Sequence, residues 1–349
     1  KNLFDLNFSP GIKKTFSEQF SFTFTPNILD WLNPRFTYNP RYTWTRDLNI
    51  GENITADLKS ENDFSASFSL SFQRLLEKFY KVESNASSSR GRSSRNRNSS
   101  NNNSNKSNDF IIDQPHFKTI LKFLYNITKK VSSISINYKY NTKNMYNNII
   151  ADFEPGYSFK LGLEDTPFEN SNSSNYSSSS GSIYTFSNTF YQELKMNTTI
   201  QITNNLSISN LEYRVSLSAN NQSVSNYNEN MTNSFFPLGT RGDEGIPMFG
   251  WSINLRGLEK IPIIDRWFKS FTINHTFSGE KSDISLENIS QKTDFKKNFT
   301  PMIGLKMKTK NVPIDINLTY NNTLTIINEG SQTERKTSDQ INIKFNYLT

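Results

Sequence analysis

The sequence predicts an all-β fold of the transmembrane antiparallel β-barrel class, with about 13 to 15 strands, long polar loops and short amphipathic helices. Three observations lead to this prediction. Apolar and polar residues alternate in stretches of about 8 to 12 residues, whereas soluble strands average about 5 to 6. Aromatic residues make up 13% of a chain whose mean hydropathy is only −0.64. No run of about 20 apolar residues, which a membrane helix needs, occurs in the 349 residues.

The alternation is clearest in two segments. From Phe64 to Phe72 every second residue is apolar and the residues between them are serines, and Ile134–Tyr140 follows the same rule. A membrane barrel tolerates such polar strands because only every second residue faces lipid. Further apolar rows begin at Phe20, Phe36, Tyr157, Leu194, Tyr213, Trp251, Phe271, Ile303, Ile314 and Ile341.

Aromatic residues near the ends of these rows predict interfacial girdles, where an amphipathic ring lies at the boundary between lipid and water. Glu18 is an exception within an apolar row, so we expect that strand to bend or to end near the interface. The girdle candidates are Tyr42, Trp44, Tyr138, Tyr140, Tyr320 and Tyr347.

Three segments break the alternation. Residues 83–109 are almost wholly Ser, Asn, Arg and Lys, and this composition predicts a disordered loop between strands. Amphipathic helical stretches are expected on either side of it, at about 73–81 and 116–128. Two further long polar loops are expected at 166–182 and 220–248.

Short turns are expected at 61–63, 204–205 and 321–322, where Asn and acidic residues cluster. Outer-membrane barrels place long loops at one end and short turns at the other, and we expect that arrangement here. The chain starts at Lys1 and carries no signal peptide, so we expect a piece or mature portion of a longer protein. Residues 1–349 are interpreted as a single barrel segment.

Basic residues fall on the polar rows, where a wall would face water. The acids on those rows are few, with Asp57, Glu193 and Asp315 as examples. The sequence therefore predicts a mildly cationic lumen that favours acidic cargo surfaces through its field. The basic row consists of Lys139, Lys160, Lys195, Arg214, Lys306, Lys308 and Lys344.

Residue types that carry chemistry are sparse. Cysteine is absent, and His116 and His275 lack partners at metal-ligand spacing. Arg241-Gly242-Asp243 matches an adhesion tripeptide, which we attribute to coincidence. The arginines of 89–97 have no interleaved aromatic residues to stack on bases, so a solvated loop is favoured over nucleic-acid binding. We therefore predict no catalytic, cofactor or metal site, no enzymatic activity and no nucleic-acid partner.

Several phrases, in order along the chain, resemble the C-terminal barrel region of the SprA family, also called Sov. They start with Trp31-Leu32-Asn33-Pro34-Arg35 before an aromatic strand and continue with Phe153-Glu154-Pro155-Gly156-Tyr157. Later come Leu258-Glu259-Lys260-Ile261-Pro262 and Phe299-Thr300-Pro301-Met302-Ile303. Each phrase is unspecific, but their order covers nearly the whole chain.

The resemblance implies a giant outer-membrane translocon of the type IX secretion system, which is linked to gliding motility. The family exports folded cargo proteins across the bacterial outer membrane. Its members contact lipid, cargo, and smaller barrel and plug proteins of the machinery. About 14 strands would then form an arc of a much larger wall. Two alternatives remain open: a closed porin or receptor barrel for small solutes, and a soluble extracellular β-rich adhesin.

Overall fold

The computed structural model describes most of the chain. The loop predicted at 83–109 lies outside the described residues, as do most of 166–182 and the tripeptide residues 242–243. The described ranges are 13–27, 29–47, 55–78, 115–168, 185–222, 227–241, 244–287, 289–309, 312–329 and 331–347.

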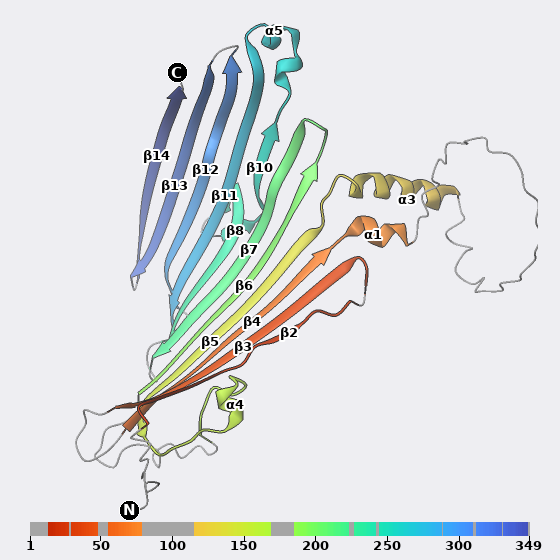
Figure 1. The fold of residues 1–349 in the computed structure, drawn as a ribbon. Coiled ribbons are helices and arrows are strands. Elements are labelled where there is room, and N and C mark those ends of the chain that lie inside the picture. The colour runs from red at the N-terminus through yellow and green to blue at the C-terminus, as the bar shows by residue number, and fades with distance from the viewer. Residues whose placement is uncertain are drawn as a thin grey trace, which may run out of the picture.

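Strands dominate these ranges and form one large antiparallel sheet, which confirms the β-rich prediction (Figure 1). Neighbouring strands follow the order β1-β3-β4-β5-β6-β7-β10-β11-β12-β13-β14, and β2 extends the β1 edge by pairing with β3. The strands are β1 Thr15–Gln19, β2 Phe22–Phe24, β3 Leu32–Asp47, β4 Thr55–Leu70, β5 Ile134–Ile150, β6 Thr185–Gln201, β7 Leu206–Gln222, β8 Tyr227–Arg241, β9 Glu244–Pro247, β10 Gly250–Leu255, β11 Phe268–Leu286, β12 Ile289–Thr309, β13 Pro313–Glu329 and β14 Gln332–Tyr347.

The long strands exceed what a bilayer requires. Strands of 16 to 21 residues, such as β4 and β12, reach about 50 to 70 Å at roughly 3.4 Å per residue. The hydrocarbon core is only about 30 Å thick. A part of each strand therefore extends beyond any membrane that the sheet crosses.

One position in the sheet is shared by two strands. Between β7 and β11, β8 pairs with both neighbours at one end and β10 pairs with both at the other. Between these halves the chain leaves the sheet as a hairpin of the end of β8 with β9. The prediction of a loop over 220–248 is wrong, because most of these residues belong to β7, β8 and β9.

Short helices follow the strands at the rims. The stretch predicted at 73–81 is helix α1, Phe72–Glu77, which Ser71 caps by accepting a hydrogen bond from the Arg74 backbone N–H. The stretch predicted at 116–128 is α3, Pro115–Thr128. Between β10 and β11 lie η2, Leu258–Lys260, and α5, Pro262–Asp265. No helix of the described ranges is long and apolar enough to cross a membrane.

Two predicted turns are wrong. Residues 61–63 lie in the middle of β4 and residues 321–322 in the middle of β13, because polar side chains on long strands mimic turn composition. The turn at 204–205 is confirmed, between β6 and β7. Since β4–β5 and β5–β6 connect at opposite ends of an antiparallel sheet, the described parts of these two long connections, 71–78 with 115–133 and 151–168, lie at opposite ends. Long loops are thus not confined to one end.

A compact core forms at one end of β3, β4 and β5. Helix α4, Tyr157–Lys160, follows β5 and places Phe159 at 1% exposure against Tyr42, Trp44, Leu58 and Tyr146. The strand predicted from Tyr157 is therefore wrong. Tyr42 and Trp44 belong to this core instead of an interfacial girdle.

Candidate functional site

The two faces of the sheet form the candidate site, and strand register determines what each face carries. Directly opposed residues of an antiparallel pair lie on the same face. Phe68 of β4 lies opposite Ile136 of β5, which lies opposite Met196 of β6 and then Tyr213 of β7. Beyond the position that β8 and β10 share, Ile303, Leu318 and Ile343 align across β12, β13 and β14. The alternating rows predicted from sequence therefore merge into one apolar band.

The band is open to its surroundings. Phe64, Phe68 and Ile136 are only half-buried although they lie inside a wide sheet. Rings of adjacent strands cover one another sideways, as in the edge-on pair of Phe36 and Phe68 with centroids 5.7 Å apart. On β14, Ile343 is 74% exposed. A water-soluble sandwich would bury such a face beneath a second layer.

On distant strands the band ends at a tyrosine. One residue pair beyond Tyr140 and Tyr320, the same face turns polar with Thr142 and Asn322. The Tyr320 hydroxyl donates to Oδ1 of Asp339 at 2.8 Å, so its polar end points away from the band. This is the orientation expected for a ring at the boundary between hydrocarbon and water.

Beyond that boundary, the segment that contains α4, residues 153–168, covers the same face of β3, β4 and β5. The Ser60 hydroxyl donates to the Phe159 carbonyl at 2.7 Å, and the Tyr146 hydroxyl donates to the Asp165 carbonyl at 3.0 Å. The Tyr38 hydroxyl, on the edge of the band, donates to the Leu161 carbonyl. Polar residues on this part of the face thus receive partners from the segment.

Lys160 does not belong to a strand or to the polar row. Its side chain is 4% exposed in α4, where Nζ lies 2.9 Å from Glu154 Oε1 and 3.7 Å from Glu18 Oε2. The hydrogen bond from Lys160 and its positive charge hold the pKa of Glu154 below its usual value. The unexpected acid Glu18 thus lies within ion-pair distance of Lys160 near the end of β1.

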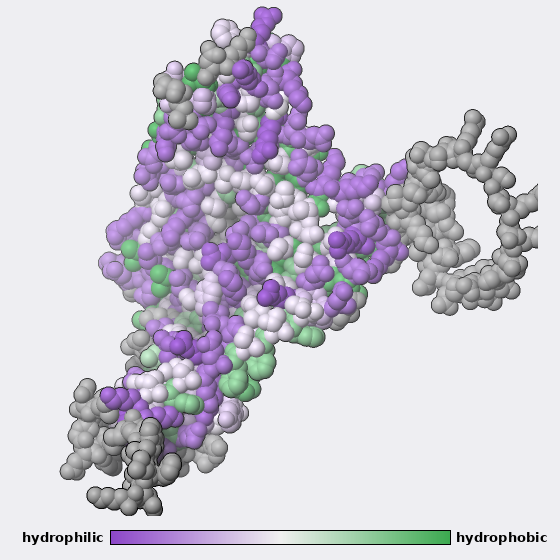
Figure 2. Space-filling view, in the orientation of Figure 1, coloured by the Kyte–Doolittle hydropathy of each residue, from purple (hydrophilic) through white to green (hydrophobic). Residues whose placement is uncertain are grey.

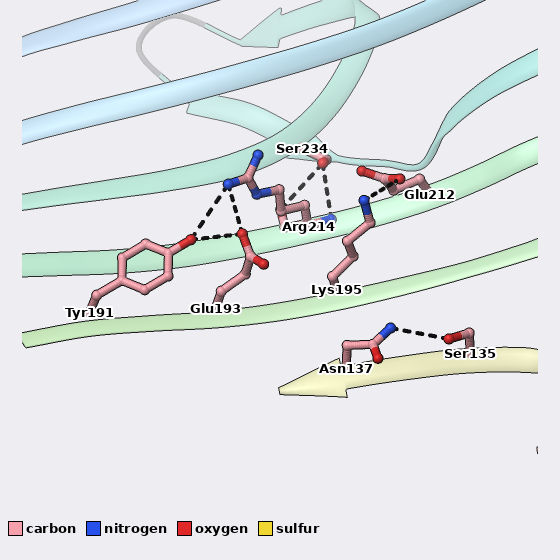
Figure 3. A network of polar contacts seen from close by, with 8 residues as sticks. All are labelled: Ser135, Asn137, Tyr191, Glu193, Lys195, Glu212, Arg214 and Ser234. Carbon is pink, nitrogen blue, oxygen red and sulfur yellow. Dashed lines mark hydrogen bonds and ion pairs between the residues drawn. The ribbon is translucent and has the colours of Figure 1, made fainter. Parts of the chain in front are cut away.

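The opposite face carries the remaining basic residues, and acids lie among them (Figure 3). Arg214 Nη2 lies 2.7 Å from Glu193 Oε2, which also accepts from the Tyr191 hydroxyl at 2.7 Å. Lys195 Nζ lies 2.9 Å from Glu212 Oε2. In the view of Figure 2, most of the surface is hydrophilic or intermediate in hydropathy.

The geometry of this network explains the pairing. Lys195 and Arg214 lie directly opposite each other on β6 and β7, which by itself is repulsive. Each cation turns along the sheet to an acid on the other strand, Lys195 to Glu212 and Arg214 to Glu193. Sequence inspection missed Glu212, because pairing across two strands depends on a register that one strand does not reveal.

The other basic residues are spread over two regions. Lys139 lies opposite Glu193, beside the network, so that acid faces two cations. Lys306 lies opposite Asp315 on β12 and β13, several strands away. Lys308 and Lys344 have exposed side chains near it in the same sheet region. The structure therefore divides the predicted row into a compensated group on β5–β7 and a more basic group on β12–β14.

The chemically capable residues form no reaction centre among the described ranges. His275 Nδ1 lies 2.7 Å from the Met302 carbonyl oxygen, and its ring lies beside Trp251 and Phe299 in the apolar band. No group of three or more His, Asp or Glu side chains suited to a metal occurs in the described part. The side chain of His116 lies outside it.

Comparison of the sequence with protein-family models and with curated proteins finds no match. The two faces of the sheet are therefore the basis for inferring a function.

Proposed function

We propose that this chain is part of the wall of a protein-conducting pore in a bacterial outer membrane. The apolar band contacts lipid, and the opposite face borders a water-filled channel. The observation that carries the proposal is the band itself, which lies on one face of the sheet, is continuous from β3 to β14 and ends at tyrosines on β3, β5 and β13. A Lys or Arg in such a band costs roughly 2 to 4 kcal/mol at mid-bilayer. The band face carries no described Lys or Arg between its two ends, whereas Arg46, Lys281, Lys297 and Arg335 lie on this face only beyond the tyrosines.

A section of a larger wall fits better than a closed porin. The strand order runs from β1 to β14 without these two pairing in the described residues, and the edge strands β2 and β14 lie on opposite sides of the sheet (Figure 1). Every residue of β14 is exposed along a 16-residue edge, which needs a further strand. A wall wide enough for this arc can pass folded proteins, as the resemblance to the type IX translocon implies. The proposed partners are lipid, cargo, and smaller barrel and plug proteins.

A soluble adhesin is the weaker alternative, because a half-buried row of Phe and Ile would be left in contact with water. The two proposals differ in detergent dependence. A wall aggregates when detergent is removed, whereas an adhesin stays monomeric in plain buffer.

Ion selectivity tests which face lines the channel. Lys306→Glu with Lys308→Glu should shift the selectivity of the reconstituted pore from anions towards cations, because both side chains are exposed on the polar face. Met307→Gln, on the opposite face between them, is the matched control and should leave selectivity unchanged. A double reversal without any shift would contradict the proposed orientation.

A further inference from the structure

Helix α3 turns an apolar stripe away from the protein. Leu121 and Tyr125 are 6% exposed on the inner side, and the Tyr125 hydroxyl donates to Glu77 Oε1 of α1 at 3.2 Å. Since α1 occupies that side, the helix cannot rotate to hide the stripe (Figure 1). The outward residues follow the spacing of one helix face and are 40% to 64% exposed: Ile120, Phe123, Leu124 and Ile127.

A second segment shows the same property without sequence similarity to the first. Between β10 and β11, around η2 and α5, Ile263 is 76% exposed, Trp267 is 70% exposed and Ile261 is 45% exposed. A polar loop would cost less in water than these large apolar groups do. Two separate segments therefore present apolar residues at the surface.

Both segments belong to one rim of the sheet. The Lys130 ammonium, just after α3, donates to the Ile202 carbonyl at 3.0 Å in the β6–β7 turn. The Arg256 backbone N–H, just before η2, donates to the Asn205 carbonyl of the same turn at 2.8 Å. Gly257 follows at φ 79°, and a Cβ there would lie 3.0 Å from the Asn205 amide, so the junction is close-packed. We call residues 115–130, 202–205 and 256–267 the rim collar.

The rim collar continues the apolar band. Leu70 and Ile134, paired with each other, are the last band residues on β4 and β5. Helix α1 starts two residues after Leu70, and α3 ends six residues before Ile134. The exposed apolar residues of the collar therefore lie where the band stops, at the end opposite to the tyrosine boundary.

The charge of the collar favours an anionic surface. Residues 115–130 contain four lysines and no acid, and Lys122 and Lys129 are exposed. Residues 256–267 add Arg256, Lys260 and Arg266 against Glu259 and Asp265. Long basic side chains beside Trp and Phe are typical of segments at the headgroup level, where the stem lies in apolar surroundings and the charge reaches water.

We propose that the rim collar lies flat in the boundary of an anionic lipid leaflet. The apolar side chains of α3 and of the α5 segment enter the acyl region, and the lysines contact lipid phosphates. A flat lipid surface reaches both segments at once and is continuous with the lipid around the band. This inference depends on the proposed wall function, since it takes the band as the part inside the bilayer.

Depth-dependent quenching tests the inference on the full chain in lipid vesicles. The chain has no cysteine, so single-cysteine variants Leu124→Cys and Ile263→Cys can each carry an environment-sensitive fluorophore. The vesicles contain a phosphatidylcholine with about one third phosphatidylglycerol, and a nitroxide quencher lies either at the headgroup or deep in the acyl chain. Leu318→Cys, in the band, and Asn317→Cys, on the polar face, are the controls.

We expect the headgroup-level quencher to remove roughly half of the fluorescence at 124 and 263, with little effect of the deep quencher. Position 318 should respond most to the deep quencher, and 317 to neither. Quenching at 318 without quenching at 124 and 263 would refute the lipid contact of the rim collar and leave the proposed wall function intact. It would point to a protein partner on the rim. No quenching at 318 would refute the wall function itself.

The charge contribution has its own test. Lys122→Glu with Lys129→Glu should lower quenching at position 124 several-fold in the anionic vesicles, because the exposed basic side chains are attracted to the anionic headgroups and the introduced carboxylates are repelled. In vesicles of phosphatidylcholine alone, the double variant should match the parent. Equal quenching of variant and parent in anionic vesicles would contradict the preference for anionic lipid.

Discussion

On one face of the same strands, apolar residues are left uncovered in one region and are covered by protein in another. Along β3, β4 and β5, residues 32–38, 64–70 and 134–140 form an uncovered apolar band. Further along, the segment with α4 covers that face, and Phe159, Leu58 and Tyr42 are buried there. The strands and the face are the same in the two regions. The second region differs in its protein cover and in the polar residues, such as Asn62 and Thr142, that interrupt the apolar row at its edge.

The difference indicates where lipid ends. An apolar row in water needs a protein layer, whereas a row in hydrocarbon needs none. The α4 cover begins where Asn62 and Thr142 replace aromatic residues, one step beyond Phe64 and Tyr140. The boundary between hydrocarbon and water can thus be placed at Tyr38 and Tyr140 on the strands β3 and β5, and at Tyr320 on β13.

The covered region should be the more sensitive to a cavity. Phe159→Ala removes a ring at 1% exposure, and we expect a loss of roughly 3 to 5 kcal/mol in local stability. Hydrogen exchange of the β4 and β5 amides near Leu58 and Tyr146 would measure it. Leu163→Ala, in the same segment but 67% exposed, should change exchange little. Equal effects of the two variants would contradict the core assigned to α4.

A charged side chain introduced into the uncovered band should destabilise the protein in a membrane. Leu318→Arg should cost roughly 2 to 4 kcal/mol of stability in vesicles, because the guanidinium enters hydrocarbon. Asn317→Arg, its neighbour on the polar face, should cost much less. Urea unfolding of both variants in vesicles measures the difference, and similar costs would place both faces in water.

The polar face should respond to loss of an acid. Glu193→Gln leaves Arg214 without the carboxylate 2.7 Å away in a half-buried network, and we expect a cost of about 1 to 3 kcal/mol. The pore should also become more anion-selective. Glu212→Gln breaks the more exposed pair with Lys195 and should cost under about 1 kcal/mol. A larger effect of Glu212→Gln would reverse this ranking.

The smallest effect concerns pH. Lys160 holds the pKa of Glu154 below the ordinary 4.5, so this ion pair stabilises the α4 segment above pH 4.5 and is lost as the pH falls through the lowered value. Proteolysis of the segment should accelerate in that acidic range. The Glu154→Gln variant should be cleaved faster than the wild type at neutral pH, and its cleavage should not accelerate further in the acidic range. If cleavage of the Glu154→Gln variant accelerated at low pH as much as that of the wild type, this ion pair would be excluded as the cause.

Sequence alternation was sufficient to predict most of the strands, since an apolar residue at every second position of Phe64–Phe72 indicates a strand without tertiary information. It missed β8 and β9, which the prediction placed in a loop over 220–248. It failed at Tyr157, where Phe159 and Leu161 mimic a strand but Gly156 and the α4 turn fold the row back over β4. It also placed turns at Asn62 and Asn322. These side chains are polar because the face leaves the band there, and only the pairing of several strands reveals this.

The candidate site was only partly predictable. The position of Lys195 and Arg214 on the polar rows follows from alternation, but their acids Glu212 and Glu193 are defined by register between β6 and β7. The ion pair between Lys160 and Glu18 joins residues that lie far apart in sequence. Such contacts depend on tertiary folding, and no local pattern encodes them.

Labelling with a lipid-soluble carbene probe tests the central claim most directly. In membranes, the account predicts modification of Phe68, Ile136 and Leu318, which share the band, and protection of their sequence neighbours Ser67, Asn137 and Asn317. Mass spectrometry resolves these adjacent positions. Labelling that ignores the alternation, or that spares Phe68, Ile136 and Leu318, would contradict a wall with one face in lipid.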